Sequence, residues 1–122
     1  MSKSKPINIA EKFSKFSDHW SPKIGAELNG QHVKFAKFQG EFTRHAHEHE
    51  DEMFLVINGV LKMEFDDRTE VVNQGEFIVI PKGVYHNPIA DEEVEVILFE
   101  PATTLNTGDS EDDRKLENLE WI

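Results

Sequence analysis

Short apolar segments separated by turn residues recur along most of this chain, at the spacing of roughly 8–12 residues that is typical of all-β sandwiches and barrels. Asn58-Gly59 is the strongest turn signal, because two-residue hairpins favour Asn-Gly. It separates the apolar segment 52–57 from the alternating segment 60–65. Further turns are predicted at Asp66-Asp67, Asn73-Gln74-Gly75 and Pro81-Lys82-Gly83. No segment of crossover-helix length lies between the strands, which excludes a parallel α/β sheet.

The 122 residues are a one-domain length, and we predict three parts within it. An N-terminal arm covers residues 1–26, a β-barrel covers residues 27–101, and a C-terminal tail covers residues 102–122. In the arm, apolar residues recur at helical spacing up to Ser21-Pro22, and Asn8 with Glu11 resembles a capping box. The arm is therefore predicted to hold a short helical segment whose apolar face consists of Ile9, Phe13, Phe16 and Trp20.

The tail differs in composition from the rest of the chain. Residues 106–113 are acidic and rich in turn formers, and residues 114–122 carry Leu116, Leu119 and Ile122 at helical spacing beside Trp121. Two interpretations are open. The tail is either loose with a short helix, or its apolar residues dock on the barrel or on a second subunit.

Charge and composition exclude several classes of function. Asp and Glu number 24 against 13 Lys and Arg, and the net charge of −11 argues against nucleic acid and anionic membranes as partners. The absence of cysteine excludes disulfides and thiolate metal sites. No apolar run approaches the ~20 residues of a membrane span, and no signal peptide is recognised. We therefore expect a cytoplasmic protein.

Three of the six histidines lie within five residues, in the segment HAHEHEDE at positions 45–52. On a strand, His45 and His47 point to the same face, so their imidazoles suit neighbouring positions on one metal ion. Glu52 can face the same interior if residues 48–51 form a turn, and His49 in that turn is predicted to be solvated. The alternative is that this acidic loop binds nothing. His86 adds a third imidazole, because Pro81 and Gly83 fix a tight bend just before it.

These two segments resemble the two sequence motifs of the cupin superfamily, in particular those of small single-domain microbial cupins. The first is His45-x-His47-x(4)-Glu52-x(6)-Gly59, and the second is Gly75-x(5)-Pro81-x-Gly83-x(2)-His86. Two positions depart from the usual pattern: four residues instead of five separate Gly40 from His45, and Ala90 stands where the family usually has asparagine. Neither departure affects a candidate ligand.

The resemblance implies a jelly-roll β-barrel in which His45, His47, Glu52 and His86 bind one divalent metal ion. Three imidazoles and one carboxylate suit Zn, Fe, Mn or Ni without selecting among them. An octahedral ion would keep two open positions for a small-molecule ligand. Strand parity predicts Phe54 and Val56 on the apolar wall beside the site, and Phe77 is a further candidate.

The function predicted on this basis is a metal-dependent enzyme, similar to dioxygenases, decarboxylases or isomerases, that acts on a small oxygenated metabolite. The alternative is a non-catalytic module that senses or stores a metal or a small ligand, since one barrel hosts many functions. No catalytic residue is assigned, although Tyr85 and Glu48 are candidates. A broad screen of substrates with metal-loaded protein would discriminate between the two.

We also expect a homodimer. Apolar side chains occupy both faces of segments 52–57 and 94–99, so one face fills the barrel and the other needs cover. The apolar face of the N-terminal arm is expected to supply part of this cover.

Overall fold

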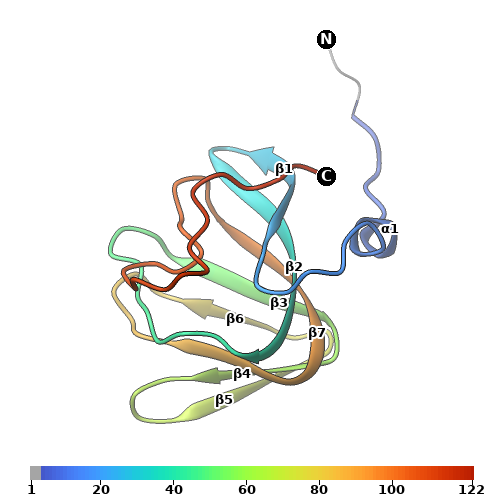
Figure 1. Cartoon of the computed structure of the whole chain (residues 1–122). Coiled ribbons are helices and arrows are strands. Elements are labelled where there is room, and N and C mark those ends of the chain that lie inside the picture. Colours follow the sequence, from blue (N-terminus) through green and yellow to red (C-terminus); the bar gives the residue numbers. More distant parts are fainter. Residues whose placement is uncertain (1–3) are drawn as a thin grey trace.

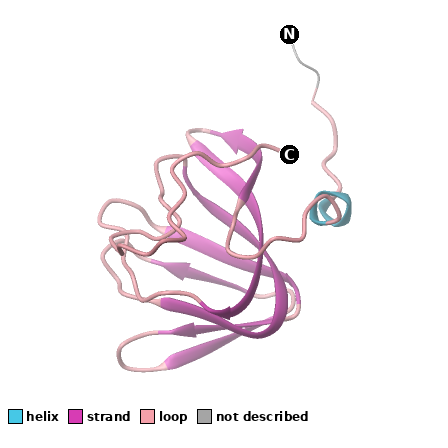
Figure 2. Ribbon diagram, in the orientation of Figure 1, coloured by secondary structure: helices cyan, strands magenta, loops and turns pink. Residues whose placement is uncertain are grey.

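The predicted turns separate seven strands, and the chain is almost entirely β-structure (Figures 1 and 2). The structure, a computed structural model, describes residues 4–122, so residues 1–3 of the expected N-terminal arm lie outside the described part. In chain order the elements are α1 (Ile9–Phe13), β1 (Lys23–Leu28), β2 (Gln31–Glu41), β3 (Glu52–Asn58), β4 (Val60–Glu64), β5 (Thr69–Asn73), β6 (Phe77–Ile80) and β7 (Asn87–Pro101).

All strand pairs are antiparallel, and they run in the order β1-β2-β7-β3-β6, with β4 joining β7 to β5. The 15-residue strand β7 connects the two halves of the barrel. Residues 89–90 and 94–101 of β7 pair with β2, and residues 87–89 pair with β4. The all-β fold predicted from the turn spacing is therefore confirmed.

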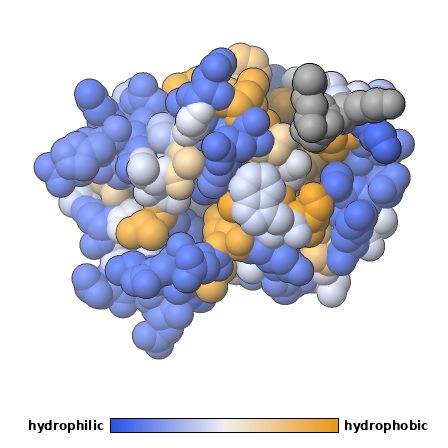
Figure 3. All heavy atoms as spheres, turned by 90° about the horizontal axis from the view of Figure 1, so that it is seen from above, coloured by the Kyte–Doolittle hydropathy of each residue, from blue (hydrophilic) through white to orange (hydrophobic). Residues whose placement is uncertain are grey.

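Alternation along the strands fills the interior. Phe54 and Val56 of β3 point inward, opposite Leu98 and Val96 of β7 in the sheet register. The remaining buried members of this cluster are Trp20, Ala36, Phe38, Leu61, Met63, Val72, Ile80, Ala90 and Val94. The surface is mainly hydrophilic when the molecule is seen from above (Figure 3), in keeping with the acidic composition.

The N-terminal helix is shorter than its apolar periodicity predicts. Asn8 caps it as expected, with the Glu11 amide donating to Asn8 Oδ1 at 2.9 Å, but α1 ends at Phe13. Phe13 packs on Phe35 outside the barrel, with ring centroids 5.2 Å apart, whereas Trp20 belongs to the interior cluster. Phe13 and Trp20 are thus buried in two separate places, and Ile9 at the start of the pattern is exposed. Within residues 4–122 the structure contains no helix with the length and hydropathy that a membrane span requires.

The C-terminal tail docks on the barrel of its own chain, and residues 102–122, all described, contain no helix. The Ile24 amide donates to the Glu120 carbonyl at 2.8 Å, and the Ile122 amide donates to the Ile24 carbonyl at 2.9 Å. The Ile122 side chain packs against the outer cluster of Phe13, Phe35 and Ile97. The helical spacing therefore does not produce a helix, and of the two interpretations the structure supports docking on the barrel.

The outer face of the sheet is only partly covered. The arm covers Phe35 and Ile97, but the apolar rows continue across β3 to the edge strand β6. There Phe77 and Val79 are 62% and 52% exposed. Phe77 pairs with Leu55 on this outer face, so the prediction that it lines the site is wrong; in β6 the deeply buried side chain is Ile80.

We propose that a second copy of the chain covers the β6 end of this face. Phe77→Lys places a charge in that contact and should shift the protein from dimer to monomer in sedimentation velocity. Val71→Lys is the control, because Val71 is likewise an exposed apolar residue, at 52%, but lies on β5. A wild-type species of 14.1 kDa at working concentration would contradict the proposal.

Candidate metal centre

Two loop residues that are far apart in sequence, His45 and His86, are joined by backbone hydrogen bonds. The His45 amide donates to the His86 carbonyl at 3.0 Å, and the His86 amide donates back to the His45 carbonyl at 2.9 Å. This antiparallel bridge is isolated in the loop after β2, so the expectation that His45 and His47 lie on a strand is wrong. The bridge places the two imidazoles side by side, with ring centroids 4.4 Å apart.

Backbone carbonyls determine which nitrogen of each ring is available. His45 Nδ1 donates to the Thr43 carbonyl at 2.8 Å, and His86 Nδ1 donates to the Val84 carbonyl at 2.9 Å. A carbonyl only accepts hydrogen bonds, so each Nδ1 carries a proton, and in the neutral ring Nε2 keeps its lone pair. The hydrogen bond that Nδ1 donates therefore fixes the tautomer in which Nε2 is free to bind a metal ion.

The structure brings together all four predicted ligands. One donor atom from each of His45, His47, Glu52 and His86 lies within 4.8 Å of the other three, and all four side chains are buried. Glu52, the first residue of β3, places Oε1 3.0 Å from His86 Nε2 and 3.1 Å from His47 Nε2. His49 lies in the loop with its side chain 80% exposed.

The donor set fits a cation. His47 Nε2 is buried and, despite the nearby carboxylate, has no hydrogen-bond partner. A nitrogen lone pair and a carboxylate oxygen 3.0 Å apart, as at His86 and Glu52, repel each other unless a proton or a metal ion lies between them. Ligands on opposite sides of an ion are roughly 4.2 Å apart when each bond is about 2.1 Å long. The cluster spans 4.8 Å at most, so it exceeds one coordination sphere by only a fraction of an ångström.

Burial and charge shift the pKa values within this cluster in different directions. Burial, helped by the neighbouring His86, lowers the pKa of His45 to about 4. Burial also acts to lower the pKa of His47, but the Glu52 carboxylate outweighs it, and that pKa lies above the usual 6.5. Burial acts to raise the pKa of Glu52, yet His47 and His86 hold it below its ordinary value. Glu52 is therefore a carboxylate, and His45 is a neutral imidazole near pH 7.

The C-terminal tail holds the residue between the first two histidines. The Ala46 amide donates to Asp109 Oδ1 at 2.9 Å, and the Asp109 amide donates to the Ala46 carbonyl at 3.0 Å. Gly108, with φ +54°, packs so closely that a Cβ atom there would lie 2.4 Å from the Ala46 carbonyl oxygen and 2.8 Å from a His45 ring carbon. The sequence reasoning did not assign these contacts, and their only signal was the turn-like Asn106-Thr107-Gly108 segment.

A network of side chains around Tyr85 supports the Asp109 carboxylate. The Tyr85 hydroxyl donates to Asp109 Oδ2 at 2.7 Å, which together with the Ala46 amide lowers the pKa of Asp109. The Arg44 guanidinium lies 4.0 Å from the Tyr85 ring centroid and is paired with Asp66. Tyr85 and Arg44 are thus engaged in supporting contacts outside the cluster.

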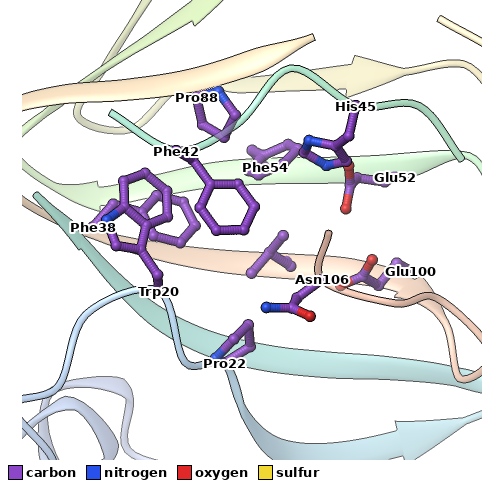
Figure 4. Close-up of a pocket in the computed structure, with 11 residues that line it drawn as sticks. Trp20, Pro22, Phe38, Phe42, His45, Glu52, Phe54, Pro88, Glu100 and Asn106 are labelled. Carbon is purple, nitrogen blue, oxygen red and sulfur yellow. The ribbon is translucent and has the colours of Figure 1, made fainter. Parts of the chain in front are cut away.

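A cavity of about 30 Å³ adjoins the cluster at His45 and Glu52 (Figure 4). Phe54 lines it as predicted; Val56 is fully buried in the core but does not line it. Sequence reasoning missed the other lining residues, which are Trp20, Pro22, Phe38, Phe42, Pro88, Leu98, Glu100 and Asn106.

Glu100 is a second buried carboxyl group beside the cluster. It is 3% exposed, and its Oε1 lies 3.3 Å from Lys34 Nζ, which is equally buried. Burial, together with the charge of Glu52, raises the pKa of Glu100 well above its ordinary value despite Lys34. This group therefore keeps its proton over a wider pH range than an exposed carboxyl.

Comparison with known proteins agrees with the β-barrel fold. Residues 31–101, more than half of the chain, match the family model of the cupin domain. A cupin-2 domain protein from Shewanella frigidimarina has 45% sequence identity and a TM-score of 0.77, over 78% of this chain and 93% of that one. Protein NMB1881 from Neisseria meningitidis has 24% identity and a TM-score of 0.74, over 80% and 100% of the two chains, and shows the fold alone. The chain therefore belongs to the cupin family.

A curated relative gives no further guidance on function. The uncharacterised protein YdbB from Bacillus subtilis strain 168 is 39% identical over 62 residues. The match spans about half of each protein, 50% of this chain and 55% of YdbB. The relationship supports the family and leaves metal, substrate and activity to the residues of the site.

Removing a predicted ligand should weaken metal binding. His47→Ala or His86→Ala should lower the affinity for Zn²⁺ by about tenfold or more, because each removes a buried donor from the cluster. His49→Ala should leave the affinity unchanged, since that side chain is exposed. Isothermal titration calorimetry measures all three. If His49→Ala abolishes binding and His45→Ala does not, the ligand pair is His47 and His49, and the assignment is wrong.

Metal affinity should also depend on pH. A metal ion binds only neutral imidazole, and the pKa of His47 lies above 6.5, so a proton on His47 competes with the ion already near neutral pH. His45, with a pKa of about 4, adds no such competition in this range. Titrations from pH 8 to pH 6 should therefore show the affinity falling as the pH falls. A constant affinity over that range would contradict the prediction.

The tail should contribute to the metal affinity through Asp109. Asp109→Ala removes the acceptor for the Ala46 amide and frees the loop between two ligands, so Zn²⁺ affinity should fall by roughly 10- to 100-fold, as for other supporting residues. Asp113→Ala is the control, because Asp113 is an exposed acidic residue of the same tail. Equal affinities of the two variants would show that the tail does not hold the site.

Proposed function

We propose that this protein is a metal-dependent enzyme that acts on a small oxygenated metabolite. The observation that carries the proposal is the junction of two features: a buried His₃Glu cluster and an apolar cavity that reaches it at His45 and Glu52. A metal ion bound by this donor set would supply Lewis-acid or redox chemistry to oxygen atoms of the substrate.

The chain's own residues have separable roles in this proposal. The three histidines hold the ion through nitrogen lone pairs, and Glu52 offsets one of its charges. The aromatic residues at the other end of the cavity keep bulk water out, which strengthens the electrostatic interactions within it. Glu100, with its raised pKa, keeps a carboxyl proton close to Glu52.

The reaction class follows from this arrangement only in outline. An octahedral divalent ion with four protein ligands would retain two open positions for vicinal oxygen atoms, which suits dioxygenase-, decarboxylase- or isomerase-like chemistry. The described residues place no further histidine at the cavity, so a separate imidazole base is not part of the proposal.

A second candidate function is a non-catalytic sensor or store. The small cavity volume favours it, because about 30 Å³ holds only two or so water-sized groups at ~10–15 Å³ each. A bound metal ion with a few water molecules would fill such a site without any turnover.

Activity of metal-loaded protein distinguishes the two candidates. Protein loaded with Fe²⁺, Mn²⁺, Ni²⁺ or Zn²⁺ should convert a member of a panel of small diketones, catechols and hydroxy acids, supplied with oxygen. His86→Ala, which lacks one ligand, should show no conversion. Metal binding without turnover of any member would favour the sensor or store, and no binding of any of these metals would contradict both candidates.

A further inference from the structure

The cavity beside the cluster has two chemically different ends. Its polar lining residues are His45, Glu52, Glu100 and Asn106, and its other seven are apolar. Figure 4 shows His45, Glu52 and Glu100 together at one end, with Trp20, Phe38 and Phe42 toward the other. A ligand in this cavity therefore meets oxygen- and nitrogen-bearing groups at one end and aromatic carbon at the other.

Among the described residues, the aromatic end offers no free hydrogen-bonding group. Trp20 is stacked between Phe38 and Phe42, with centroids 4.4 and 4.7 Å away and interplanar angles of 11° and 14°. Its indole N–H is already bonded to the Gln39 carbonyl at 3.0 Å. Asn106 is also satisfied: its amide group donates to the Arg114 carbonyl at 2.9 Å and accepts from the Leu116 amide at 2.9 Å.

No cation is available to an anionic group at that end. Among residues 4–122, no lysine or arginine lines the cavity. The nearby Lys34 lies beside Glu100 at the polar end, with Nζ 3.3 Å from Glu100 Oε1, and it donates to the Thr104 carbonyl at 3.4 Å. The Arg114 guanidinium lies over Phe42 and is bonded to Asp112. A carboxylate or phosphate placed among the aromatic rings would thus be buried without a partner, at a large cost in free energy.

Trp20 is the aromatic residue of this wall that precedes the first strand, β1. It belongs to the N-terminal arm and has φ +59°, a conformation that bulky residues rarely adopt. Such a conformation persists only where surrounding contacts impose it, and it is concentrated at functional sites. Because the cavity measures about 30 Å³ while Trp20 occupies its aromatic end, this side chain limits the space for a ligand body.

We propose that the ligand of this cavity carries oxygen atoms at one end only and has an uncharged, apolar body, and that Trp20 determines how large this body can be. The inference rests on the proposed function, since it assigns the oxygen-bearing end to the metal centre. It excludes sugar phosphates, dicarboxylates and polyhydroxylated sugars, each of which needs polar partners along its whole length.

Hydroxamates test the charge preference, because they bind a metal ion through two oxygen atoms and leave the body free to vary. Because the wild-type cavity holds only about two water-sized groups, the Zn²⁺-loaded full chain carrying Trp20→Ala is titrated calorimetrically with 4-methylpentanohydroxamate and with succinic monohydroxamate. These probes share one shape and differ in a terminal isopropyl group against a terminal carboxylate. The isopropyl probe should bind at least tenfold more tightly. Equal or tighter binding of the carboxylate probe would overturn the proposal.

The role of Trp20 is tested with a larger body. Trp20→Ala should raise the affinity for 3-phenylpropanohydroxamate at least tenfold relative to acetohydroxamate, whose body is a single methyl group. Trp20→Phe, which keeps an aromatic ring in the stack, should give a smaller gain and serves if the alanine variant does not fold. Trp121→Ala is the matched control, because Trp121 is 57% exposed and lies outside this cavity. An unchanged ratio in both Trp20 variants would overturn the assignment of Trp20.

Binding of acetohydroxamate shows whether the proposed function fails or only the proposed ligand class fails. If the chain retains no Zn²⁺, or the loaded chain does not bind acetohydroxamate, the proposed function is wrong and the ligand class is wrong with it. If acetohydroxamate binds but the longer probes are not distinguished, the metal centre stands and only the ligand class is wrong. Metal content measured after each titration shows that the probe has not removed the ion.

Discussion

The reciprocal pair of backbone hydrogen bonds between His45 and His86 is the contact on which the site depends. It joins the loop after β2 to the bend before β7, two segments that are 41 positions apart in sequence. Each of the two rings also donates its Nδ1 proton to a carbonyl two residues earlier, so Nε2 is left to face the cluster. Ring position and tautomer are therefore both set by the backbone, before any ion is bound.

The barrel strands do not complete this site alone. The C-terminal tail contributes Gly108 and Asp109, which hold Ala46 between two candidate ligands. The N-terminal arm contributes Trp20, which closes the aromatic end of the cavity. Both segments lie outside the range that matches the cupin family model, residues 31–101. We infer that the family core supplies the donor set and that the two flanking segments adapt it to a particular ligand.

Sequence reasoning succeeded where a residue's role is local. The Asn58-Gly59 turn, the Asn8 cap and the motif spacing each depend on a few neighbouring residues, and they gave the all-β fold and the four clustered side chains. It failed where apolar residues recur at helical spacing but pack against separate parts of the barrel. Phe13 and Trp20 are buried on opposite sides of one sheet, so α1 ends at Phe13, and residues 116–122 dock on the barrel without forming a helix. Phe77 was placed on the wrong face because its parity depends on the register with β3.

The central claim is that one metal ion binds between His45, His47, Glu52 and His86. Crystals of the Zn²⁺-loaded protein, measured on both sides of the zinc absorption edge, test it most directly. The account predicts a single strong anomalous peak per chain, about 2.0–2.2 Å from three imidazole nitrogens and one Glu52 oxygen. A peak at the exposed His49 and its acidic neighbours, with none inside the cluster, would contradict it.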